Sequence, residues 1–198
     1  MKLTREFFEQ STEQLAAALL GCRLEHRSPQ GVASGVIVET EAYLGVGDDA
    51  CHASRGMTPR NAVMFGPPGR SYVYFIYGMY FCFNVVSGPV GSGEAVLIRA
   101  LVPGEDGISL MKERRKKEGL RDLCSGPGKL CEALGITREH NDLSLLSGSL
   151  RVLPRLQPIS QEEIVAGSRI GISSATHLQL RFGLKGSPYL SKQFTPSR

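Results

Sequence analysis

The first part of the chain combines one helix-forming stretch with two strand-forming ones. Ser11 and Gln14 have the spacing of a capping box, and the residues after them are good helix formers. Gly21 is typical of the position that ends a helix. The next two segments flank a turn that contains Pro29 and Gly31. We predict one helix and then the two strands of a hairpin, at residues 12–20, 22–26 and 32–43.

The central segment, residues 71–86, has the strongest β-strand pattern in the chain. It is rich in aromatic and β-branched side chains, and a period of two places Tyr72, Tyr74 and Ile76 on one face. Gly78 interrupts the pattern and favours a turn or bulge. We predict two strands that are joined near Tyr77 and Gly78.

The remaining pattern predicts a mixture of helices and strands. Residues 45–69 form a loop rich in Gly, Pro, Asp and Arg, and loops of this length are usually functional or mobile. A third strand covers residues 95–101. Residues 125–129 open a short helix that Gly135 closes, and short strands and turns follow Asn141. We therefore expect a single α+β domain over residues 1–198, with a curved and mostly antiparallel sheet flanked by helices.

Composition limits the class of protein. The 198 residues include 23 glycines and carry a net charge of +4, which is compatible with a polyanionic partner but does not demonstrate one. We expect no membrane span and no secretion signal, and hence a cytoplasmic, nucleoid-associated protein if the source is bacterial. The five cysteines form no Cys-x-x-Cys pair, so we expect reduced thiols rather than disulfides or a zinc ribbon.

A basic segment covers residues 112–121, where six residues are basic and two are acidic. The simplest interpretation is a solvated helix or loop. A nuclear-import signal or a nucleic-acid-binding patch is the alternative.

Two glutamates and one arginine are candidates for chemistry. Glu39 and Glu41 lie two residues apart on a predicted strand, so both carboxylates share a face or lie at its end. Arg99 lies within an apolar strand and needs an acidic partner, for which Glu41 is the obvious candidate. A buried carboxylate could serve as a general base. A solvated edge strand and a purely structural ion pair are the alternatives.

Other candidates concern binding. His52 lies in the long loop and could stack or transfer a proton, although a loop histidine is often only a surface residue. The tyrosines of residues 72–80 could stack on nucleobases or could simply form core. The segment Ser125-Gly-Pro-Gly-Lys129 could cradle a phosphate, but it lacks the glycine and the Ser or Thr of a Walker loop.

Taken together, an ordered series of segments resembles the alkyladenine (3-methyladenine) DNA glycosylase family. The series covers roughly residues 15–190 and consists of the segments LLGC (19–22), VIVETEAYLG (36–45), TPRN (58–61), MF (64–65), YVYFIYGM (72–79), CFN (82–84), AVLIRAL (95–101), GPGKLC (126–131), ALG (133–135) and RIGI (169–172). Near the C-terminus, many members have Trp-Arg-Phe where this chain has Leu180-Arg181-Phe182.

The resemblance implies roles for particular residues. Glu41 would be the general base, and Arg99 would help to hold its water. The flipped base would lie between Tyr43 and His52 on one side and Tyr74 on the other. Asn84 would lie against the 2-amino group of guanine. Tyr77 would fill the gap left in the duplex, with Met79 and Tyr80 beside it on a protruding, DNA-inserting hairpin. The further DNA contacts would be Thr58, Arg60 and Lys129.

The implied reaction fits the chemistry of these residues. Alkylation at N3 or N7 makes a purine cationic and hence a good leaving group, and a carboxylate can stabilise the oxocarbenium-like sugar and deprotonate the attacking water. The resemblance implies no metal and no cofactor. It implies a monomer acting on double-stranded DNA that contains damaged purines. A non-catalytic nucleic-acid binder and a carbohydrate hydrolase that uses Glu39 and Glu41 are the alternatives.

Overall fold

The sheet is organised around one long strand, β2 (Gly31–Tyr43), in the computed structural model, which describes residues 2–194. One edge of β2 pairs with β5 (Glu94–Pro103). The other edge pairs first with β1 (Arg23–Ser28) and then with β8 (Arg181–Leu184). Strand β2 therefore joins elements from both ends of the sequence.

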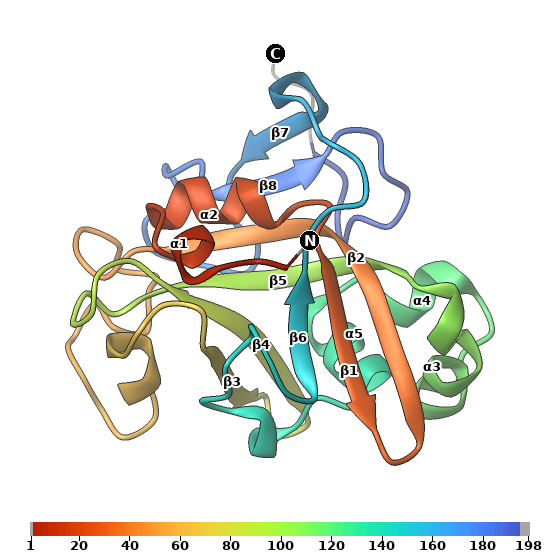
Figure 1. The fold of residues 1–198 in the computed structure, drawn as a ribbon. Helices are drawn as coiled ribbons and strands as arrows, with labels where there is room; N and C mark the ends of the chain where they lie inside the picture. The colour runs from red at the N-terminus through yellow and green to blue at the C-terminus, as the bar shows by residue number, and fades with distance from the viewer. Residues whose placement is uncertain (1, 195–198) are drawn as a thin grey trace.

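Over the described residues the sheet has eight strands, and each of their pairings is antiparallel. Its order is β3-β4-β5-β2-β1-β6, while β7 lies beyond β8 (Figure 1). This architecture confirms the predicted α+β class. The remaining strands are β3 (Ser71–Ile76), β4 (Tyr80–Ser87), β6 (Leu150–Leu153) and β7 (Ile164–Gly167).

The α-helices form two groups (Figure 1). Helices α1 and α2 lie over β2 and β5, whereas α3, α4 and α5 gather on the opposite side of the molecule. Their bounds are α1 (Arg5–Phe8), α2 (Thr12–Leu19), α3 (Ile108–Arg115), α4 (Leu120–Cys124) and α5 (Pro127–Leu134). The 3-10 helices are η1 (Ala62–Phe65), η2 (Glu105–Gly107), η3 (Arg138–His140) and η4 (Gln161–Glu163).

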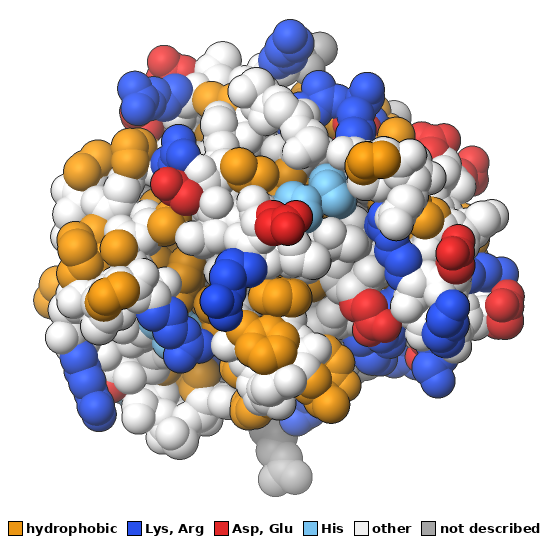
Figure 2. Space-filling view, turned by 90° about the horizontal axis from the view of Figure 1, so that it is seen from below, with side chains coloured by type: hydrophobic (Ala, Val, Ile, Leu, Met, Phe, Trp, Pro, Cys, Tyr) orange, Lys and Arg blue, Asp and Glu red, His pale blue; other side chains and the backbone are white. Residues whose placement is uncertain are grey.

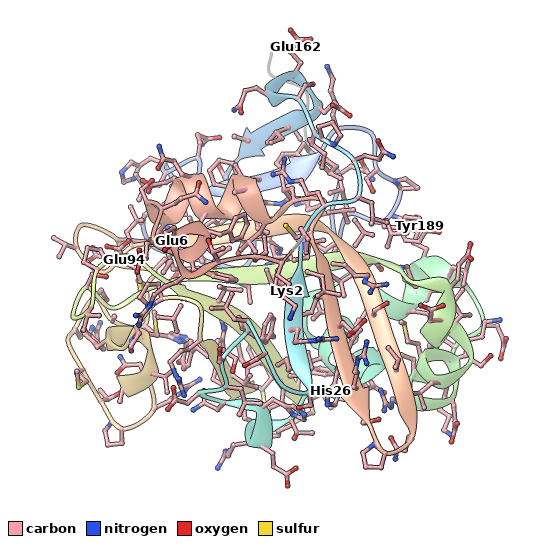
Figure 3. All side chains as sticks on the ribbon, in the orientation of Figure 1. Lys2, Glu6, His26, Glu94, Glu162 and Tyr189 are labelled. Atoms are coloured by element: carbon pink, nitrogen blue, oxygen red, sulfur yellow. The ribbon has the colours of Figure 1, made fainter. Side chains whose placement is uncertain are left out.

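Helix α2 has the ends that its sequence predicts. The Ser11 side chain accepts a hydrogen bond from the Gln14 backbone N–H at 3.3 Å, which is one half of a capping box. Gly21 follows the helix with a φ of +81°, a conformation that glycine adopts without steric cost. The hydroxyl of Thr12, the first helical residue, donates to the Glu94 carboxylate at the start of β5. Figure 3 shows Glu94 beside the two N-terminal helices. These contacts anchor α2 on the sheet.

Alternation along β2 separates the core from the polar face. Thr40 is buried and donates its hydroxyl proton to the Ala16 carbonyl oxygen of α2 at 2.9 Å. Glu39 and Glu41 therefore point to the opposite face of the sheet. The β2–β5 register is irregular beside Glu39, at the level of Arg99. Such irregularities bend a strand and re-aim its side chains.

The basic segment forms the end of α3, a turn and the start of α4. Lys116 ends α3 with a φ of +52°, and most side chains from there to Arg121 are exposed, as predicted for a solvated segment. At the end of α3, Arg114 and Arg115 depart from this prediction. Arg114 donates to the Ala133 carbonyl oxygen and to Gln30, and the Arg115 side chain is only 10% exposed and pairs with Glu132. Seen from below, the surface has Lys and Arg side chains scattered among hydrophobic and acidic ones (Figure 2).

Two further sequence expectations are tested by the fold. The long loop is not structureless, because it contains η1, and Asn61 before η1 donates to the carbonyl oxygens of His52 and Gly56. All five cysteines are free and buried. Within residues 2–194, no helix has both the length and the apolar character needed to cross a bilayer.

Candidate active site

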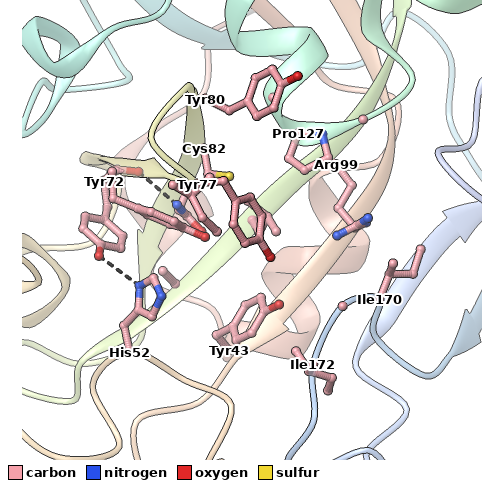
Figure 4. A pocket seen from close by; sticks show the side chains of 18 of the residues that line it. Tyr43, His52, Tyr72, Tyr77, Tyr80, Cys82, Arg99, Pro127, Ile170 and Ile172 are labelled. Carbon is pink, nitrogen blue, oxygen red and sulfur yellow. Dashed lines mark hydrogen bonds between the residues drawn. The ribbon is translucent and has the colours of Figure 1, made fainter.

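A cavity of about 560 Å³ opens on the polar side of the sheet. Its walls come from the β3–β4 hairpin, from β5, from the start of α5, from the loop after β2 and from residues 170–172 (Figure 4). These segments are far apart in sequence and meet only because β2 pairs with strands on both edges. The cavity is large enough for a small organic group such as a nucleobase.

The four residues predicted to bind a base, Tyr43, His52, Tyr74 and Asn84, all line this cavity. The rings of His52 and Tyr74 are 4.6 Å apart and nearly perpendicular, with an interplanar angle of 74°. The Asn84 amide donates to the Tyr72 carbonyl oxygen at 3.0 Å, which fixes its orientation. One end of the cavity is therefore aromatic and well ordered.

His52 is electrically neutral at this aromatic end. Its Nδ1 lies 3.1 Å from the Tyr72 hydroxyl oxygen (Figure 4). Burial, and then the charge of nearby Arg60, lower the pKa of His52 below its ordinary value. Burial also raises the pKa of Tyr72 to about 12, so the phenol keeps its proton. This end of the cavity thus presents uncharged rings.

Glu41 lies immediately behind the cavity wall. Its side chain has no exposed surface, and the residues lining the cavity do not include it. Oε2 accepts from the Tyr43 hydroxyl at 2.9 Å and from Arg99 Nη1 at 3.2 Å, and Oε1 accepts from the Ile170 backbone N–H at 2.7 Å. All three donors belong to residues that line the cavity. Glu41 is consequently held in the cavity wall by three residues that a bound molecule would touch.

Arg99 is paired with Glu41, the partner predicted for an arginine in an apolar strand, and also with Glu39. Its Nη1 contacts Glu41, and its Nε contacts Glu39 Oε1 at 3.1 Å. Burial disfavours the charge of Arg99, but Glu41 and Glu39 outweigh burial and raise its pKa. Because both carboxylates bind one guanidinium, they do not face each other across the cavity. This geometry does not suit a hydrolase that needs two carboxylates flanking a glycosidic bond.

A second buried ion pair supports Tyr43. Arg169 makes two hydrogen bonds of 2.6 Å to Asp48, and the side chains of both residues are inaccessible to solvent. The Arg169 guanidinium carbon also lies 4.6 Å from the centre of the Tyr43 ring. Arg169 precedes Ile170, so the same pair holds the backbone that donates to Glu41. Arg169 belongs to the RIGI segment but has no predicted role, and no sequence pattern singles out Asp48.

Three predicted DNA-contacting residues lie at the turn between β3 and β4. Tyr77, Met79 and Tyr80 are 81%, 64% and 41% exposed, which is unusual for such large apolar side chains. Tyr77 and Gly78 both have positive φ, +54° and +68°, which is the pattern of a type I′ turn. A tyrosine is uncommon in this conformation. Tyr77 and Tyr80 also line the mouth of the cavity.

Of the other predicted DNA-contacting residues, Arg60 and Lys129 lie beside the cavity, whereas Thr58 does not line it. Arg60 is exposed, donates to the Phe75 carbonyl oxygen at 3.3 Å and lies 5.3 Å from the centre of the Tyr74 ring. Thr58 is exposed, and its hydroxyl donates to Asn61 at 3.0 Å. Lys129 lines the cavity in the first turn of α5.

Several lining residues have no distinctive sequence signal. Tyr72, Ile76 and Cys82 are strand residues of ordinary type, and Ile170 and Ile172 enter the cavity from a distant segment. The alternation on β3 places Tyr72 and Ile76 on the same face as Tyr74, and Tyr72 is also among the tyrosines predicted to stack on nucleobases. Burial raises the pKa of Cys82, so its sulfur is a thiol. Among the residues described by the structure, no three His, Cys, Asp or Glu side chains cluster to hold a metal ion.

Comparisons with known proteins relate this cavity to one family. A model of the methylpurine-DNA glycosylase family matches residues 6–188. A relative from Rhodopseudomonas palustris (strain BisB18), provisionally named a 3-methyladenine DNA glycosylase, is 52% identical over 193 residues, covering 98% of this chain and 92% of the relative. Relatives of the same name from Methanoculleus marisnigri and Carboxydothermus hydrogenoformans are 51% and 46% identical, and each comparison covers 98% of this chain and 100% of the relative. The matched region includes every segment that lines the cavity.

Proposed function

Because the chain belongs to the methylpurine-DNA glycosylase family and is therefore a hydrolase of N-glycosyl bonds, we propose a specific reaction for it. The protein acts as a monomer on double-stranded DNA, which in the cell is chromosomal DNA. It flips an alkylated or deaminated purine into the cavity. A water molecule activated by Glu41 then hydrolyses the N-glycosidic bond. The products are the free base and an abasic site that enters base excision repair.

One observation carries this proposal. Tyr43 lines the aromatic cavity and also donates its hydroxyl proton to Glu41, so the residue that would stack on a base is bonded to the carboxylate. Arg99 and Ile170 complete the donors to Glu41 and also line the cavity. A base held against Tyr43 would therefore bring its sugar close to a carboxylate.

For a cationic, alkylated purine, the hydrolysis needs only groups that are present at this position. A neutral deaminated purine must also take up one proton as it leaves, and the proton released from the water balances it. The bond between the purine nitrogen and C1′ breaks, and its electron pair leaves with the base. The sugar becomes oxocarbenium-like and is stabilised by the negative charge of Glu41. The water oxygen bonds to C1′, and the water proton passes to Glu41 Oε1, which within residues 2–194 accepts one hydrogen bond, that of Ile170. Arg99 keeps Oε2 occupied and orients the carboxylate.

The aromatic end of the cavity suits a damaged purine. A cationic base is attracted to the faces of tyrosine rings by roughly 0.5–2 kcal/mol per contact. His52 adds a ring that carries no competing positive charge, because its pKa is lowered. A neutral deaminated base lacks the cation–π attraction and depends on stacking and shape.

A base-release assay tests the proposal. Duplexes that each contain one 3-methyladenine, 7-methylguanine, hypoxanthine or ethenoadenine are incubated with the protein, and the free base is separated by chromatography. We expect release from at least one alkylated duplex and no release from the undamaged control. Tight binding to all four lesions without release would instead identify a non-catalytic DNA-binding protein.

The affinity for DNA should depend on salt through a small number of phosphate contacts. Basic side chains are scattered over the face in Figure 2, and Arg60 and Lys129 lie beside the cavity. Replacing either by alanine should reduce the slope of log K against log salt by about one. Fluorescence anisotropy at several salt concentrations measures this slope. Lys185→Ala, an exposed residue after β8, is the control, and equal slopes in all variants would exclude both residues from the interface.

Tyr77→Ala should impair base flipping without destabilising the fold. A ring that is 81% exposed contributes little to packing, but it can occupy the gap left by a flipped base and offset an unstacking cost of a few kcal/mol. Excision should fall most for hypoxanthine, which stays paired in the duplex. A fluorescent base analogue reports flipping, and thermal denaturation reports stability.

Phe83→Ala is the control for Tyr77→Ala, because it shows how much stability is lost when a buried ring of the same hairpin is removed. Phe83 is fully buried on β4 of the same hairpin, so its truncation should cost about 3–5 kcal/mol. If Tyr77→Ala lowered the melting temperature as much as Phe83→Ala while flipping stayed normal, Tyr77 would have a structural role only.

A further inference from the structure

We propose that Glu39 is a positioning residue that fixes Arg99 in the orientation needed for Glu41 to activate water. The inference rests on the proposed function of Glu41 and assigns a separate role to the neighbouring carboxylate. Glu39 does not contact the substrate. It acts on the reaction only through Arg99.

The contacts of Arg99 show how Glu39 holds it. Each of the three guanidinium nitrogens has one partner: Nε donates to Glu39 at 3.1 Å, Nη1 to Glu41 at 3.2 Å and Nη2 to the Ser191 hydroxyl oxygen at 3.3 Å. A planar guanidinium held at all three nitrogens has a single orientation. Arg99 thus reaches Glu41 with one nitrogen only and leaves Oε1 of Glu41 to Ile170 and the water.

Glu39 is itself fixed from the side away from the cavity. Oε1 accepts from Arg181 Nε at 2.7 Å and from the Ser191 hydroxyl at 2.8 Å, and Oε2 accepts from the Ser191 backbone N–H at 2.5 Å. Arg181 in turn lies 3.9 Å from the centre of the Phe194 ring. Residues 191–194 therefore cover Glu39, which has no exposed surface.

The partners of the two glutamates distinguish their roles. Every partner of Glu41 lines the cavity, whereas Arg181 and Ser191, the other partners of Glu39, do not. Glu39 does not touch a substrate, because three of its four hydrogen bonds come from Arg181 and Ser191, which lie outside the cavity wall. Its negative charge serves to balance Arg99 and Arg181.

Loss of the Glu39 charge would change the geometry at Glu41. With an uncharged Nε partner, Arg99 would be held less strongly and could rotate to bind both oxygens of Glu41 in the bidentate form that arginine and carboxylate prefer. Oε1 would then be occupied by the guanidinium and unable to take the proton of the water. Misplacement of a catalytic group by about 1 Å can cost about a hundredfold in rate.

Glu39→Gln tests this inference when binding and chemistry are measured separately. We expect the single-turnover rate of base release at saturating enzyme to fall by about tenfold to a hundredfold. The dissociation constant for lesion-containing DNA should change by less than about threefold, because the cavity walls are unaltered. A loss confined to binding, or no loss at all, would overturn the proposal.

Glu25→Gln is the matched control. Glu25 on β1 is also buried and binds three arginines, Arg23, Arg27 and Arg151, but it does not contribute to the cavity. If removal of a buried sheet carboxylate acts only through stability, both variants should show the same rate at a temperature where they are folded. That result would overturn the positioning role of Glu39.

Ser191→Ala provides a milder variant if Glu39→Gln does not fold. It removes the hydroxyl between Glu39 and Arg99 and leaves both charges in place. We expect a decrease of about threefold to tenfold in the single-turnover rate, with an unchanged dissociation constant. An unchanged rate in a folded Ser191→Ala protein would overturn the inference. Base release by the unmodified protein decides the proposed function independently of either variant.

Discussion

Replacing Glu41 by glutamine is expected to lower the rate of base release by about a hundredfold to ten-thousandfold, the range that general bases contribute. Glutamine keeps the shape of the side chain but cannot accept the proton of the water or stabilise the oxocarbenium-like sugar by charge. Because Glu41 lies behind Tyr43, Arg99 and Ile170 and does not line the cavity, the walls that hold the base should remain intact. Affinity for lesion-containing DNA should stay within about tenfold.

Single-turnover release from a 3-methyladenine or hypoxanthine duplex, with a binding titration on the same DNA, measures both effects. Glu25→Gln again controls for loss of a buried carboxylate, and its rate should match that of the unmodified protein. Near-normal release by Glu41→Gln would refute the assignment of the base. If Glu39→Gln abolished release while Glu41→Gln did not, the two glutamates would have exchanged roles.

Asp48→Ala is expected to lower the free energy of unfolding by about 3–5 kcal/mol, because it leaves the buried charge of Arg169 without a partner. For a domain of this size, that loss corresponds to a decrease of roughly 6–20 °C in melting temperature. Base release should also fall, since Arg169 supports the Tyr43 ring and precedes the backbone N–H that binds Glu41.

Thermal denaturation of Asp48→Ala beside Asp142→Ala checks this expectation. Asp142 also pairs with an arginine, Arg70, but the Asp142 side chain is 53% exposed, so its loss should cost no more than about 1 kcal/mol. Replacing both members of the buried pair by apolar residues, as in Asp48→Leu with Arg169→Met, should recover part of the stability. Equal melting temperatures for Asp48→Ala and Asp142→Ala would contradict the stabilising role of the buried pair.

Local sequence signals predict the secondary elements well. The Ser11 cap, Gly21 and the alternation of Tyr72, Tyr74 and Ile76 each depend on residues close together in the chain, and the structure confirms all three. The 3-10 helix η1 was missed because side-chain bonds of Asn61 order a segment whose composition indicates a loop.

Pairings between distant residues could be predicted only in part. An arginine in an apolar strand requires an acidic partner, and this requirement predicts the pair of Arg99 with Glu41. The second pair, of Arg99 with Glu39, depends on the irregular β2–β5 register, which the sequence pattern does not predict. Asp48 and Arg169 are 121 residues apart, and neither has a neighbour that indicates the other. Such contacts follow from the sheet topology, which residue patterns do not determine.

The long separations in this site affect the order in which it can form during translation. The Ile170 donor to Glu41 and the Ser191 donor to Glu39 lie 129 and 152 residues after their acceptors. A ribosome delivers β2 and β5 early, so Glu39, Glu41 and Arg99 emerge long before these donors. A nascent chain that has emerged only as far as residue 168 has the aromatic hairpin but an incompletely bonded Glu41. The proposed base removal, which produces abasic sites in DNA, is thereby restricted to chains that have already placed their last strands on the sheet.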